Sequence, residues 1–131
     1  MIATAIYARL TATTAVTALV SDRIYPVKAP QGCDMPYITF RLISQVPENT
    51  KDTSNQFDRY RVQIDCIGDD FDDVETLAYV VRNALDRSRG TWAGVTVNTM
   101  IYDNTNDLAT DFQDDSEQVY GKAVDFIIIT T

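Results

Sequence analysis

Residues 58–85 read DRYRVQIDCIGDDFDDVETLAYVVRNAL, and the spacing of apolar side chains changes within this stretch. Its first part alternates apolar with polar residues, the pattern of a strand with one buried face. After Gly68 the apolar spacing becomes three and four residues, which predicts an amphipathic helix. The apolar residues of the strand are Tyr60, Val62, Ile64 and Cys66, and those of the helix are Phe71, Val74, Ala78, Val81 and Leu85. This stretch therefore predicts a strand that runs directly into a helix.

The charges of the predicted helix agree with its direction. Asp69 or Asp70 can cap its first turn, and further acids follow immediately, where they interact favourably with the helix dipole. Gly90 is expected to end the helix. The basic residues near its end are Arg82, Arg87 and Arg89.

A second alternating stretch, YITFRLISQV at residues 37–46, predicts the hairpin partner of the first strand. Its inward side chains are expected to be Ile38, Phe40, Leu42 and Val46. A register that sets Arg41 opposite Gln63 and Thr39 opposite Asp65 avoids an unfavourable contact between Arg41 and Arg61. The polar residues 47–56 between the strands predict a long protruding hairpin loop.

The two ends of the chain complete the predicted fold. Ile2, Ile6 and Leu10 form one stripe of an opening helix, which the threonines of residues 11–15 are expected to kink or break. Residues 94–102 and 119–129 read as two more strands, joined by an acidic connector at residues 103–118. The prediction is a single α+β domain over residues 1–131, in the order α-β-β-α-β-β. Two helices cover one face of an antiparallel sheet of about four main strands.

The last strand has apolar residues on both faces. Val124, Phe126 and Ile128 suffice for the core, yet Ile127 and Ile129 make the opposite face apolar as well. A strand that needs cover on both sides indicates an interface between subunits.

Composition limits the possible functions of the 131 residues. Nineteen acidic and eleven basic residues give a net charge of −8 and no histidine is present, so nucleic acid and anionic membranes are unfavourable ligands. The apolar N-terminus lacks the basic start of a signal peptide, and no stretch is long enough to span a membrane. Cys33 and Cys66 are expected to be reduced thiols of a soluble protein made inside the cell.

No set of residues points to catalysis, and we predict no catalytic residue, cofactor or metal. Without histidine the commonest general base and metal ligand is missing. The acids of residues 69–75 suit a helix cap better than a metal site, and residues 103–114 fit a calcium-binding loop poorly because Leu108 stands where glycine is needed. The arginines at positions 41, 59 and 61 form a solvated face or ion pairs between subunits rather than a phosphate site.

The segment RIYPVKAPQGCDMP at residues 23–36 fits neither a helix nor a strand. Pro26, Pro30 and Pro36 restrict its backbone, and Gly32 permits a turn. We interpret this connector as a stiff loop that presents a preordered contact surface.

TALVSDRIYP at residues 17–26, followed by APQG and MPYITFRLIS, resembles the tail-completion or tail-terminator family of long-tailed bacteriophages. Residues 61–85 and 120–129 resemble the second-hairpin strand with its helix and the closing strand of that family. The acidic connector departs from the family's pattern. The resemblance implies a structural virion protein that forms a ring, usually a hexamer, at the head-proximal end of the tail tube. Such a ring ends tube polymerisation and docks the head-neck connector.

The partners so implied are further copies of the chain, the tail tube protein and a neck or head-completion protein, with DNA passing through the lumen without specific binding. Two other functions stay open: an acidic regulator that mimics DNA and binds a host protein, and a carboxylate- or metal-dependent enzyme using residues 69–75 or 103–114. The residues expected at assembly interfaces are Tyr25, Pro26, Pro30, Gln31, Gly32, Pro36, Arg41, Glu48, Lys51, Arg59, Arg61, Asp111, Asp114, Asp115, Ile127 and Ile129.

Overall fold

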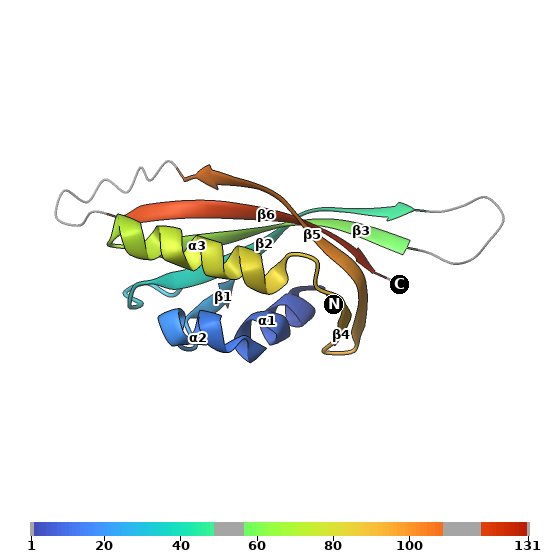
Figure 1. The fold of residues 1–131 in the computed structure, drawn as a ribbon, viewed down its shortest axis with the longest axis horizontal. Coiled ribbons are helices and arrows are strands. Elements are labelled where there is room, and N and C mark those ends of the chain that lie inside the picture. The colour runs from blue at the N-terminus through green and yellow to red at the C-terminus, as the bar shows by residue number, and fades with distance from the viewer. Residues whose placement is uncertain (1, 49–56, 109–118, 131) are drawn as a thin grey trace.

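A computed structural model describes residues 2–48, 57–108 and 119–130 (Figure 1). Three helices and six strands follow one another in these ranges. They are α1 (Ile2–Ala12), α2 (Thr14–Val20), β1 (Ile24–Pro26), β2 (Tyr37–Glu48), β3 (Phe57–Gly68), α3 (Phe71–Leu85), β4 (Gly90–Trp92), β5 (Val95–Asp107) and β6 (Tyr120–Thr130).

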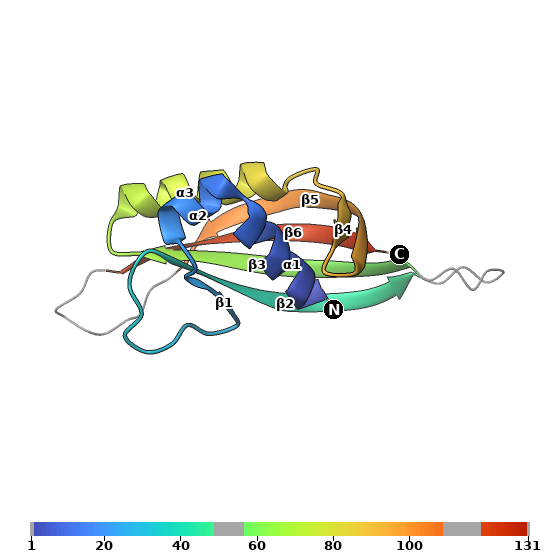
Figure 2. The same ribbon diagram turned by 90° about the horizontal axis from the view of Figure 1, so that it is seen from below.

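The strands form one sheet in the order β1-β2-β3-β6-β5-β4. All neighbouring pairs are antiparallel except β1 with β2, which is parallel. The α+β class is therefore confirmed, but the expected four strands and two helices are wrong in detail. The additional strands β1 and β4 have three residues each, too few for an alternating pattern to be recognised in the sequence. All three helices lie on the same face of the sheet (Figure 2).

The opening helix is broken into α1 and α2, which are bent by 86° relative to each other. Thr13 at the break has an extended backbone, with φ of −92° and ψ of 109°. The hydroxyls of Thr11 and Thr13 donate to the carbonyls of Tyr7 and Arg9 one turn earlier, a pattern that bends helices. The bend lets both pieces bury an apolar side, with Ile6 and Leu10 from α1 and Val16 from α2.

Helix α3 begins where the sequence predicts, because the Asp70 carboxylate accepts a hydrogen bond from the Asp72 amide at 2.9 Å. Its buried stripe is Val74, Leu77, Ala78, Val81 and Leu85. Phe71 is exposed, in contrast to the prediction. Its ring lies beside the core rather than in it and packs edge-on against Tyr120. The helix ends at Leu85 rather than at Gly90, which instead opens β4.

The hairpin register is as predicted over the first half of β2. Arg41 lies opposite Gln63 and Thr39 opposite Asp65. Between Leu42 and Ser44 the register shifts by one residue, so that Ile43 is a β-bulge. The bulge reverses the alternation beyond it, and Val46 lies opposite Arg59 on the outward face. Its expected place on the inward face was therefore wrong.

The sheet face opposite the helices, here called the outer face, carries the odd-numbered residues of β3 and β6. Ile127 lies opposite Arg61, and Ile129 lies opposite Arg59. Asp125 shares this face, is half-buried, and its Oδ1 atom has no hydrogen-bond partner within the described ranges. Burial raises the pKa of the Asp125 carboxyl above its ordinary value of 3.8, although Arg61 nearby opposes the rise.

Shortening the fully buried Leu77 tests the core under α3. Leu77→Ala is expected to lower the free energy of unfolding by about 2–5 kcal/mol, because it removes apolar contacts and leaves a cavity. Denaturant unfolding of the isolated chain measures the loss. Asn83→Ala, on the exposed side of the same helix, is the control and should change stability by about 0.5 kcal/mol or less.

The carboxylate of Asp125 gives a pH-dependent prediction. Because its folded-state pKa is raised, its contribution to stability is greatest at low pH and is lost as the pH rises through the folded-state pKa. Asp125→Asn should therefore unfold at a higher temperature than the wild type at pH 7. The difference should shrink as the pH falls toward 3.8. Equal or lower stability of the variant at pH 7 would contradict the argument.

Candidate assembly surfaces

The connector at residues 23–36 was expected to contain no strand, but it includes β1, and its remaining residues 27–36 are held at both ends by hydrogen bonds to their neighbours. The Val27 amide donates to the carbonyl of Phe40 at 2.8 Å, next to the pairing of β1 with β2. Arg23 Nε donates to the Pro36 carbonyl at 2.9 Å. These contacts fix where the connector leaves the sheet and where it returns. This supports the interpretation of the connector as an ordered element.

Val27 has a φ of 66°, a conformation that a β-branched residue rarely adopts. Its side chain is 72% exposed, so burial of the side chain does not offset the strain. The surrounding hydrogen bonds must hold it. Strain of this kind concentrates at functional segments. The strained backbone of Val27 therefore marks the start of the connector as the part of the loop whose conformation is most restricted.

The predicted residues of the connector are surface residues or support them. Pro26, Pro30, Gln31 and Gly32 are exposed, whereas Tyr25 and Pro36 are half-buried. Tyr25 packs edge-on against Tyr37, with the ring centroids 6.4 Å apart. Gly32 has a φ of 80° and open space around it, which agrees with the turn expected there.

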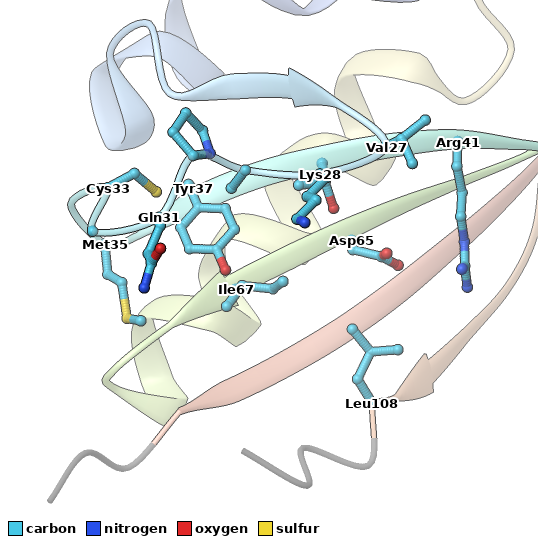
Figure 3. Close-up of a pocket in the computed structure, with 14 residues that line it drawn as sticks. Val27, Lys28, Gln31, Cys33, Met35, Tyr37, Arg41, Asp65, Ile67 and Leu108 are labelled. Carbon is cyan, nitrogen blue, oxygen red and sulfur yellow. The ribbon is translucent and has the colours of Figure 1, made fainter. Parts of the chain in front are cut away.

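An open groove of about 790 Å³ lies between the connector and the sheet. Figure 3 shows Gln31 and Cys33 on the connector side of it, and Tyr37, Asp65 and Ile67 on strands β2 and β3. Arg41 and Leu108 also line it. The groove joins the connector to one end of the outer face, so both belong to one continuous surface.

A second surface lies at the opposite end of the outer face, where β2 and β3 extend beyond the helices (Figure 1). We call it the outer patch. Val46, Phe57 and Ile101 are 53%, 38% and 48% exposed. Arg61 crosses the patch and its Nη1 lies 2.7 Å from Asp103 Oδ2. The patch consists of Val46, Phe57, Ile101, Ile127 and Ile129 with Arg59 and Arg61 between them.

Arg41, Arg59 and Arg61 share the outer face, as predicted, and the two surfaces divide them. Arg59, Arg61, Ile127 and Ile129 meet in the outer patch, but Arg41 lines the groove instead. Glu48 is the last residue of β2. The predictions for Lys51, Asp111, Asp114 and Asp115 lie outside the described residues.

The acids at the start of α3 are exposed, and Asp69, Asp70 and Asp73 line one open hollow beside Tyr120. Within residues 2–48, 57–108 and 119–130, no group of three or more carboxylates and thiols could hold a metal ion. Glu75 lies 3.4 Å from the ammonium of Lys122, which also contacts Asp107 at 2.8 Å. The hydrogen bond that the Lys122 ammonium donates to Asp107 raises the pKa of Lys122. The ion pairs of Lys122 with Glu75 and Asp107 therefore connect α3 with β5 and β6.

Lys122 was missed in the sequence analysis. It occupies an inward position of β6, two residues before Val124, where a core residue is expected. A lysine at such a position needs acidic partners, and this is the signal that could have identified it.

The two thiols are poor nucleophiles. Cys66 is fully buried, and burial raises the pKa of its thiol strongly. Burial also raises the pKa of Cys33, with a further contribution from the neighbouring Asp34. Both cysteines are therefore expected in the protonated form, which is unreactive.

Among the described helices, none alone has the length and hydropathy to cross a membrane. The bent pair α1 and α2 meets these two criteria when taken together. Four residues of α1 and two of α2 are buried in the domain, so the apolar character of this pair is used in the core.

Comparison with known proteins supplies the family. A family model described as tail completion protein gp17 matches residues 4–131. The chain is similar in structure to a chain from the virion of a native gene transfer agent particle, with a TM-score of 0.76 and 16% identity. That match covers 96% of this chain and 91% of the other.

A second solved structure has a TM-score of 0.65 and 13% identity. It is matched over 99% of this chain and 93% of its own. No curated protein matches the sequence. Both structural similarities concern the fold, whereas the family model spans nearly the whole sequence. The chain therefore belongs to the family of the tail completion protein gp17, whose members are structural proteins of phage tails.

Proposed function

We propose that the chain forms a ring at the head-proximal end of the phage tail tube. There it ends polymerisation of the tube and provides the surface on which the head-neck connector docks. The observation that carries the proposal is the family match over residues 4–131. The geometry supports it, because the outer patch leaves apolar side chains uncovered at one end of the sheet, as expected of a subunit that assembles.

A ring needs contacts between two different surfaces of identical subunits, repeated until the circle closes. The domain has three distinct surfaces of this kind: the connector with its groove, the outer patch and the helix layer. The connector and the outer patch lie toward opposite ends of the long axis of the domain (Figure 1). One end can therefore face the tube while the other faces the neck.

The charge of the chain suits a ring through which DNA passes. Six copies would carry a formal charge of about −48, from −8 for each. Attraction between phosphates and basic side chains is what holds DNA on a protein surface. An acidic lumen therefore lets DNA move through without being bound.

Disruption of the gene in a phage that encodes this chain tests the function. We expect DNA-filled heads without tails and free tails, because the surface that joins them is missing. Tails of abnormal length would indicate that the ring also terminates the tube, whereas free tails of normal length would indicate a joining role alone. Electron microscopy of lysates provides the measurement, and intact virions with attached tails would refute the proposal.

The connector gives a second test of this function. Pro26→Ala combined with Pro30→Ala should weaken head–tail joining more than it lowers the stability of the isolated chain, because both prolines are exposed and shape a contact loop. Complementation of the disrupted gene measures joining, and thermal unfolding measures stability. Normal joining with a destabilised domain would show that the prolines serve only the fold.

A further inference from the structure

The sheet has two edges that the described part of the chain leaves partly unpaired. At one edge, β1 pairs with β2 only at residues 38–40. At the other, β4 pairs with β5 only at residues 95–97. The far ends of β2 and β5 point toward opposite ends of the domain (Figure 1), and residues 41–47 and 103–107 are exposed. Edge strands with unpaired N–H and C=O groups favour pairing with another chain.

The backbone groups of β2 that point to its open edge follow from its hydrogen bonds. The Ile38 amide and the Phe40 carbonyl bond to the residues on either side of β1, so both residues point to this edge. The direction alternates along a strand, so Leu42 also points there, beyond the end of β1. The bulge that follows Leu42 makes Gln45 the next such residue and Pro47 the one after it.

The same reasoning identifies the free groups of β5. The Met100 carbonyl and the Tyr102 amide bond to the loop that follows α3, so they point away from β6. The register shifts once after Tyr102, and Thr105 and Asp107 are therefore the next residues that point to the open edge. The Leu108 amide donates to β6 at 2.8 Å, which agrees with this alternation.

We propose that the free part of β2 in one copy pairs with the free part of β5 in the next copy, so that the sheets of neighbouring subunits are continuous. This inference rests on the proposed ring and specifies its repeating contact. Leu42 lies opposite Asp107 of the neighbour, and Gln45 lies opposite Thr105. Each pair exchanges two hydrogen bonds in an antiparallel ladder, so every free N–H and C=O group of these residues is used.

The two edges match in spacing and in extent. The β2 bulge lies between Leu42 and Gln45, and it brings these residues into step with Asp107 and Thr105. Pro47 is the next residue on the edge of β2 and has no N–H to donate, a common way to end pairing. On β5 the loop after α3 occupies the edge from Tyr102 backward. Pairing therefore ends at the same place on both strands.

The side chains brought together are compatible. The free part of β2 carries Leu42, Ile43 and Val46, which are 46%, 45% and 53% exposed and are partly covered by the neighbour. No pair in this register joins like charges. The pairs are Leu42 with Asp107, Ser44 with Asn106, Gln45 with Thr105, Val46 with Asn104, and Pro47 with Asp103. The ion pair between Arg61 and Asp103 within each copy stays intact.

The strand directions suit a ring. The pairings from β2 through β3 and β6 to β5 are all antiparallel, so β2 and β5 run in opposite directions. Copies related by rotation about one axis keep this relation, and β2 meets the β5 of its neighbour antiparallel. The contact joins two different edges of identical chains. It is therefore heterologous and forms a ring when the rotation closes.

The displacement between neighbours also suits a closed sheet. Within one copy Asp107 is in line with Ile38 across the strands, whereas the contact places it opposite Leu42, four residues further along β2. Four residues correspond to about 13 Å along the strands, and the strands β2, β3, β6 and β5 span about 19 Å across the sheet. The strands then incline by about 35° to the ring axis, as in closed barrels. The register follows from the free backbone groups alone, so this tilt is independent support.

Proline and alanine at the same position separate the backbone from the side chain. Gln45→Pro and Thr105→Pro each remove an N–H that points to the open edge, whereas Gln45→Ala and Thr105→Ala keep it. Each proline variant should raise the protein concentration needed for assembly by at least about tenfold over its alanine counterpart, because every contact loses a hydrogen bond. Native mass spectrometry and light scattering measure assembly, and thermal unfolding shows whether each variant is folded.

Disulfide formation tests the register even where proline is not tolerated. Ser44 and Asn106 lie opposite each other in the contact as a non-hydrogen-bonded pair, with Cα atoms about 4.5 Å apart, which suits a disulfide. In a Cys33→Ser background, a mixture of Ser44→Cys and Asn106→Cys chains should form a covalent heterodimer on mild oxidation. Gln45→Cys mixed with Asn106→Cys is the matched control. It should not cross-link, because Gln45 lies on the other face of β2.

The outcomes separate this inference from the proposed function. A wild-type chain that stays monomeric at about 1 mM would overturn both the ring and the contact. A wild-type ring without the disulfide, or one in which folded proline variants assemble like their alanine counterparts, would overturn the contact alone. Loss of assembly with Gln45→Pro but not with Thr105→Pro would also overturn it, and would assign the edge of β2 to a symmetric contact or to a tube protein.

Discussion

The structure depends on one constraint, which is that β6 has apolar side chains on both faces while the helices cover only one. On the inner side Phe126 and Ile128 pack under α3 and are fully buried. On the outer side Ile127 and Ile129 lie at half-buried positions beside arginines of β3. Folding therefore leaves part of the apolar surface of β6 in contact with water, and burial of this surface would be favourable. The same strand that organises the core therefore also carries apolar side chains on the outer face.

The main elements of the fold were predictable because they follow from repeating patterns. The alternating pattern predicted β2 and β3, and avoidance of a contact between Arg41 and Arg61 predicted their register correctly as far as Leu42. The bulge at Ile43 was not predictable, because an inserted residue changes the register without changing the composition. Its consequence was the wrong face for Val46. The edge strands β1 and β4 were missed because three residues are too few to show a period.

The candidate surfaces were only partly predictable. Residues on paired strands could be placed together once the register was known, as for Arg59 with Ile129. Arg41, Arg59 and Arg61 were correctly placed on one face of the sheet, but the sequence did not show that Arg41 also lines the groove beside the connector. Lys122 was overlooked because the pairing of β6 with β5, which brings it opposite Asp107, cannot be read from either strand alone. The acidic residues 109–118 lie outside the described part of the chain.

The bulge in β2 also bears on how this family can diverge. Before Ile43 the strand must satisfy the core, as the burial of Ile38 and Phe40 requires. Beyond it, described residues up to Pro47 are exposed, so substitutions there scarcely affect folding. The end of β2 beyond the bulge can therefore change in sequence without loss of the fold.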